Sequence, residues 1–140
     1  DVDREQDYTI KAVKEWEKLI AKTPDSPYAK KAKVLVSQGK RRVAESVAFI
    51  IHFYCKQDVY HACAYRAIQL ADEYPEFVDL RVDALEHAIT ALGEVAKAKI
   101  ADPTSDKNLY FKTMTADEIN ARAENFKKLL ADYKKSVEKK

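Results

Sequence analysis

The fold is decided by residues 24–75, which read PDSPYAKKAKVLVSQGKRRVAESVAFIIHFYCKQDVYHACAYRAIQLADEYP. A helical pattern runs over residues 26–56, breaks at Gln57-Asp58 and resumes over residues 59–74. In the first helix, apolar and small residues recur at steps of three and four, which places them on one face: Tyr28, Ala32, Leu35, Gly39, Val43, Val47, Ile50 and Tyr54. The second helix is rich in small residues, so its backbone can approach a neighbour closely: Ala62, Cys63, Ala64, Ala67 and Ala71. Two such helices are expected to pack against further helices on both sides.

Stop and start signals divide the rest of the chain into further helices. Prolines at positions 24 and 75 follow helical patterns that they cannot continue. Ser26 before Pro27 suits an N-cap with proline at the first helical position. Thr115 with Glu118 forms a capping box, and Asp3 is expected to cap the first helix. Helices are therefore predicted over residues 4–22, 27–56, 59–74, 79–101 and 116–137, with no strand.

This pattern predicts an all-α fold, an antiparallel helix-turn-helix, tetratricopeptide-like solenoid of about five helices with one long central helix. Residues 1–101 are expected to form the repeats, residues 102–115 a linker, and residues 116–140 a helix that packs on the repeats. The side chains expected to be largely buried share the inward-facing positions of these helices: Trp16, Leu35, Val43, Ile50, Tyr54, Leu70, Leu85, Ile89 and Phe126.

Composition excludes several classes of protein. The 140 residues are 46% hydrophobic and 34% charged, and the net charge of +2 is too small to indicate nucleic-acid binding. No apolar run approaches the roughly 18 residues of a membrane-spanning helix. No secretion signal is recognised, and the opening DVDREQDYT leads us to expect a mature or truncated piece.

Reactive side chains give little sign of chemistry. Cys55 and Cys63 flank the turn, where a disulfide is conceivable, but we favour two unbridged, buried small residues. Zinc binding by these cysteines with His52 and His61 is not expected, because the ligands would not converge. His87 is interpreted as an isolated surface residue. We therefore expect no catalytic residues, no metal and no cofactor, and the protein is predicted not to be an enzyme.

The series of residues across the first hundred positions resembles a known family. PDSPYA at Pro24–Ala29 is followed at a matching spacing by Arg42, Ala44, Phe53-Tyr54, Tyr60, Arg66 and Tyr74-Pro75. Over about residues 3–100, the chain resembles the carboxyl half of the BamD family of outer-membrane β-barrel assembly lipoproteins, which are built from tetratricopeptide repeats.

The resemblance implies a non-catalytic scaffold at the periplasmic face of the bacterial outer membrane. Members of this family bind the periplasmic domains of the barrel-forming subunit BamA and other lipoproteins of the assembly machine. They meet the membrane only through an N-terminal lipid anchor, which this chain does not include. No nucleic acid and no small-molecule substrate are implied. An arginine of the family makes a charge contact to the last of those periplasmic domains, and Arg66 stands at its position.

Helical spacing extends this predicted contact surface. Gln69 and Glu73 follow Arg66 by three and seven positions, so they share its stripe together with Ala62. The three polar residues Arg66, Gln69 and Glu73 are the predicted partner-binding residues. They are available unless the C-terminal helix covers them.

The sequence differs from the family pattern in three places, and a second function remains possible. Asp58 replaces the usual glycine of the turn, Val47 replaces a common glutamate, and a longer C-terminal tail follows residue 101. Asp58 tolerates the left-handed backbone that such a turn needs. The alternative is a generic tetratricopeptide adaptor that binds a peptide or protein partner in its groove.

Overall fold

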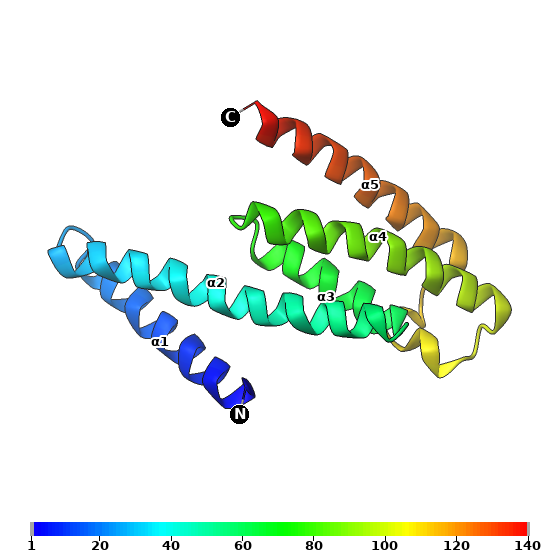
Figure 1. The fold of residues 1–140 in the computed structure, drawn as a ribbon, viewed down its shortest axis with the longest axis horizontal. Coiled ribbons are helices and arrows are strands. Elements are labelled where there is room, and N and C mark those ends of the chain that lie inside the picture. The colour runs from blue at the N-terminus through cyan, green and yellow to red at the C-terminus, as the bar shows by residue number, and fades with distance from the viewer. Residues whose placement is uncertain (1, 140) are drawn as a thin grey trace. The chain divides into compact units, whose positions relative to one another are not determined.

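The computed structural model describes residues 2–139, apart from the side chains of residues 2–5, 106 and 107. Every regular element in this range is helical, which confirms the predicted all-α fold class. The elements are α1 (Val2–Lys22), α2 (Pro27–Lys56), α3 (Tyr60–Glu73), α4 (Val78–Ala101), the 3₁₀ helix η1 (Asp106–Phe111) and α5 (Ala116–Glu138) (Figure 1). In the described part of the chain, no helix combines the length and apolar character needed to span a membrane.

The predicted start signals are confirmed where the structure describes them. The Ser26 hydroxyl accepts a hydrogen bond of 3.0 Å from the Ala29 amide ahead of α2. The Thr115 hydroxyl accepts one of 3.1 Å from the Glu118 amide at the start of α5. The first helix begins at Val2, one residue before the expected cap, so the prediction for Asp3 was wrong in position. The Asp3 side chain lies outside what is described.

The turn between α2 and α3 depends on one residue with an unusual backbone. Asp58 has a φ of 58°, in the left-handed region that most side chains avoid. Aspartate adopts this region more readily than other non-glycine residues, so the expectation that Asp58 preserves the turn is confirmed. The Asp58 carboxylate also accepts a hydrogen bond of 2.9 Å from the Tyr60 hydroxyl, which ties the turn to the first residue of α3.

The chain forms two compact units, residues 1–46 and residues 47–140, and α2 contributes to both. In the first unit, α1 packs against the N-terminal part of α2 at Gly39. A Cβ atom at position 39 would lie 2.6 Å from Cγ2 of Val13, so only glycine allows this close approach. The helix continues without a break through Gly39, and the prediction of a single long α2 is confirmed.

The second unit has a core of small and aliphatic side chains. The predicted small-residue face of α3 is buried, and it packs on α4 through residues such as Ala84 and Ala88. Leu70 and Leu85 are buried there as predicted, with exposed fractions of 1% and 0%. Helix α5 lies along α4 (Figure 1). The guanidinium of Arg81 on α4 lies 4.6 Å from the centre of the Tyr133 ring on α5.

The predicted inner face of α2 is right in the middle of the helix, where Ala32, Gly39 and Val43 are buried, and wrong by one residue near its two ends. Val43 is buried as predicted, but Leu35 is exposed and Ile50 is only half-buried, while Ile51 is buried. The prediction for Leu35 was therefore wrong. Ala29 and Ala32 are almost fully buried in the first unit, whereas their larger neighbours Tyr28 and Leu35 are exposed. The other predicted core residues are partly buried: Trp16, Tyr54, Ile89 and Phe126.

Cys55 and Cys63 form a disulfide bond that joins the end of α2 to α3. Our preference for two unbridged cysteines was therefore wrong. The tight turn at Asp58 brings their Cα atoms to 5.1 Å, within the usual range for a disulfide.

Residues 102–115 pack against the second unit. Phe111 and Asn108 are buried, with exposed fractions of 2% and 1%. The Lys99 ammonium donates hydrogen bonds to the carbonyls of Phe111 and Lys112. The assignment of residues 1–101 to repeats and of 102–115 to a linker stays a prediction.

Candidate partner-binding surface

Arg66 projects from α3 at the edge of the second unit's core. Its side chain is half-buried, and its guanidinium lies 5.3 Å from the centre of the Tyr54 ring on α2. Such a cation–π contact holds a guanidinium in place without using its N–H donors. Among the described residues, Arg66 has no hydrogen-bond or ion-pair partner, so those donors are available to a carboxylate.

Gln69 and Glu73 follow Arg66 on the same side of α3, and both are exposed. The structure therefore brings the three predicted residues together on one accessible stripe. Ala62 was expected to share that stripe, but it is buried with an exposed fraction of 5%. Helical spacing does place Ala62 on this side of α3, but it lies one turn nearer the start of the helix, where η1 packs against α3.

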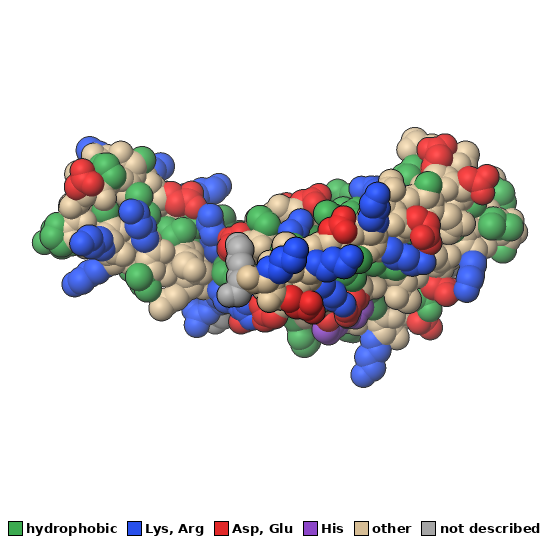
Figure 2. Space-filling view, turned by 90° about the horizontal axis from the view of Figure 1, so that it is seen from above, with side chains coloured by type: hydrophobic (Ala, Val, Ile, Leu, Met, Phe, Trp, Pro, Cys, Tyr) green, Lys and Arg blue, Asp and Glu red, His purple; other side chains and the backbone are tan. Residues whose placement is uncertain are grey.

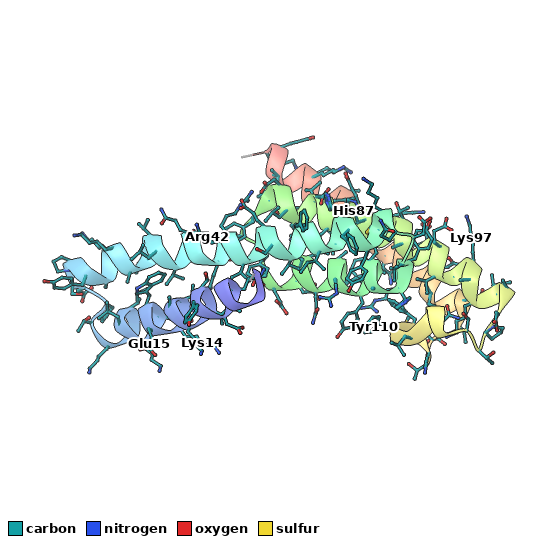
Figure 3. All side chains as sticks on the ribbon, turned by 60° about the horizontal axis from the view of Figure 1, so that its bottom comes forward. Lys14, Glu15, Arg42, His87, Lys97 and Tyr110 are labelled. Carbon is teal, nitrogen blue, oxygen red and sulfur yellow. A yellow bond between two sulfur atoms is a disulfide. The ribbon has the colours of Figure 1, made fainter. Side chains whose placement is uncertain are left out.

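The C-terminal extension covers a different part of α3. The Tyr110 ring of η1, labelled in Figure 3, stacks on Tyr65, and ring centres 4.4 Å apart with an angle of 11° between the planes define this contact. It also lies 5.4 Å from the His61 ring. Burial lowers the pKa of the His61 imidazole. The extension thus covers the first turns of α3, whereas Gln69 and Glu73 stay exposed.

Position 47 has an apolar role in this chain. Val47 is partly buried and packs against the core of the second unit. A carboxylate at this position would lose hydration, so the valine replaces a charged group with a core contact.

One cluster of polar side chains has no counterpart among the residues predicted from the sequence. His87 was interpreted as isolated, but its ring centre lies 4.5 Å from that of His52, and both rings contact Asp83. The earlier interpretation of His87 was therefore wrong. The spacing of four between Asp83 and His87 places both on one face of α4. The contribution of His52 from α2 depends on helix packing, which no local pattern encodes.

Basic and acidic side chains are interspersed on the face shown in Figure 2. This distribution agrees with the net charge of +2 and favours recognition through individual polar contacts over binding to a polyanion.

A comparison with protein families gives a match over most of the chain. The model of a family described as outer membrane lipoprotein, YfiO, matches residues 1–109. Searches of curated proteins and of solved structures gave no match.

Proposed function

Because the chain belongs to the outer membrane lipoprotein family YfiO, which is the family of BamD, we propose that it is a non-catalytic scaffold of the outer-membrane β-barrel assembly machinery. In this proposal its second unit binds the periplasmic domains of a BamA-like barrel-forming subunit. The protein acts at the periplasmic face of the outer membrane, held there by a lipid anchor of the full-length protein. The disulfide between Cys55 and Cys63 supports this location, because such bonds persist in oxidising compartments.

The proposal rests mainly on the position and the unpaired donors of the Arg66 guanidinium. Its guanidinium is positioned by the Tyr54 ring, its donors are unpaired among the described residues, and exposed Gln69 and Glu73 lie next to it. A planar guanidinium held in this way suits a bidentate contact with a carboxylate. Gln69 can donate and accept further hydrogen bonds, and Glu73 favours a basic group on the same partner.

The structure gives no support to the alternative of a peptide groove along α3. Such a groove would need basic and amide side chains on the small-residue face. That face instead carries residues such as Ala64 and Ala67, which are buried against α4.

A titration of the purified periplasmic domains of the barrel-forming subunit tests the proposal. We expect Arg66→Glu to weaken binding by about 2 kcal/mol or more, roughly 30-fold, because a desolvated charge pair becomes a like-charge contact. Arg122→Glu is the matched control, since Arg122 is also half-buried and its guanidinium lies 5.6 Å from the centre of the Phe126 ring on α5. Unchanged affinity for Arg66→Glu, or an equal loss for Arg122→Glu, would contradict the proposal.

A further inference from the structure

Three potential metal ligands from two helices converge in the second unit. His52 lies on α2, and Asp83 and His87 lie on α4, where His87 is labelled in Figure 3. One ligand atom of each residue lies within 4.8 Å of those of the other two. Nε2 of His52 is 2.5 Å from Oδ2 of Asp83, and Nδ1 of His87 is 3.5 Å from Oδ1 of the same carboxylate.

The hydrogen bond of His87 sets its tautomer. Nδ1 lies 2.8 Å from the backbone carbonyl oxygen of Asp83. A carbonyl only accepts, so Nδ1 carries the proton and the lone pair is on Nε2. Histidines that bind metals commonly donate their second N–H to a backbone carbonyl in this way.

We propose that His52, Asp83 and His87 form a site for a divalent transition-metal ion, with Zn²⁺ as the best match. Two imidazoles and one carboxylate are ligands that zinc favours, and a site with three protein ligands keeps its fourth position for water. Ca²⁺ and Mg²⁺ need more oxygen ligands than this cluster offers. This site goes beyond the proposed scaffold function and does not depend on it.

The distances require only small adjustments. Two ligand atoms of a tetrahedral zinc ion lie roughly 3.3 Å apart, as follows from bonds of about 2.0 Å. The ligand atoms of the three side chains lie within 4.8 Å of one another, so the wider pairs must close by at most about 1.5 Å. The 2.5 Å contact between His52 and Asp83 must open by about 0.8 Å. The His52 side chain is 53% exposed, so it has room to rotate. Its proton moves from Nε2 to Nδ1 by exchange with solvent, which frees the Nε2 lone pair for the ion.

The ion would join α2 to α4 at the surface of the second unit. Asp83 and His87 are one turn apart on α4, and His52 supplies the only ligand from α2. Because the three ligands come together only in the folded chain, the ion binds the folded form in preference to the unfolded one. Binding therefore raises the melting temperature as the Zn²⁺ concentration rises.

Calorimetric titration of the untagged 140-residue chain with Zn²⁺ tests the site. We expect one ion per chain for the wild type, and at least about tenfold weaker binding for His52→Ala and for His87→Gln. His61→Ala is the matched control, because His61 is the third histidine of the chain and lies outside the cluster. It should bind Zn²⁺ as tightly as the wild type.

Imidazole NMR of the wild-type chain gives a second result that requires no variant. Zn²⁺ should shift the ring signals of His52 and His87 and leave those of His61 unchanged. Three results would overturn the proposal: no saturable Zn²⁺ binding, binding that survives in His52→Ala and His87→Gln, or an equal loss in His61→Ala.

Discussion

The disulfide between Cys55 and Cys63 provides a quantitative test of how the second unit is stabilised. The two cysteines are 8 positions apart and join the end of α2 to the first turn of α3. The bond restricts the unfolded chain by closing this loop, and for about 8 residues the loop-entropy estimate gives about 2.5 kcal/mol at 25 °C. Opening the bond should lower the free energy of unfolding by that amount, while the helices stay folded.

Urea denaturation followed by far-ultraviolet circular dichroism measures this loss. Oxidised wild type, reduced wild type and Cys55→Ala are compared, because Cys55 is only half-buried and its truncation leaves the buried Cys63 in place. We expect the midpoints of reduced wild type and of Cys55→Ala to coincide. Both should lie about 1.2 M below that of oxidised wild type, for a typical dependence of about 2 kcal/mol per M.

The control is Cys55→Ala with and without reductant, since it has no disulfide to open. A reductant effect on this variant would show that the reagent acts elsewhere. An unchanged midpoint for reduced wild type would refute the reasoning, because the bond would then not restrict the unfolded chain.

Three further predictions concern packing and pH. Gly39→Ala should destabilise the first unit by about 1–3 kcal/mol, because the added Cβ would lie 2.6 Å from Cγ2 of Val13. Urea denaturation followed by tryptophan fluorescence measures this loss, and a gain in stability would contradict the prediction. Leu85→Ala should lower the free energy of unfolding by about 2–5 kcal/mol and Ile50→Ala clearly less, because Leu85 is fully buried and Ile50 is not. Equal losses in urea denaturation would show that the buried face of α2 is misassigned. The folded-state pKa of His61 lies below its ordinary 6.5, so the folded chain binds fewer protons and stability falls as the pH drops through this value. His61→Ala should reduce the dependence of the free energy of unfolding on pH just below pH 6.5. An unchanged pH dependence would contradict the lowered pKa of His61.

Local signals in the sequence predict the helix ends well. Ser26 before Pro27 and the capping box at Thr115 act within one turn, so their hydrogen bonds are encoded by residues close in sequence. Asp58 likewise marks a turn through its own backbone preference.

Helical faces are predicted less precisely, because they depend on which neighbour a helix meets. Ile50 and Ile51 fit the periodic pattern almost equally well, and contact with the rest of the second unit selects Ile51. Leu35 fits the pattern too, yet it is exposed, whereas Ala29 and Ala32 are buried in the first unit. Periodicity gives the spacing of a buried face, while packing decides its rotation.

Contacts between helices are the part that the sequence does not reveal. The bond between Cys55 and Cys63 depends on the geometry of the turn, and the approach of His52 to His87 depends on how α2 packs on α4. The stacking of Tyr110 on Tyr65 depends on the path of residues 102–115. For the candidate surface, the resemblance identified Arg66, and the structure added its contact with Tyr54.

Site-specific photo-crosslinking in cells tests the proposed scaffold function most directly. A photoreactive residue is placed at Gln69, which is exposed beside Arg66, and in a separate variant at Asp132, which is exposed on α5. We predict that the chain with the probe at position 69 crosslinks to the barrel-forming subunit, and that adding Arg66→Glu abolishes this product. Absence of that crosslink, or a crosslink from position 132 instead, would contradict the account.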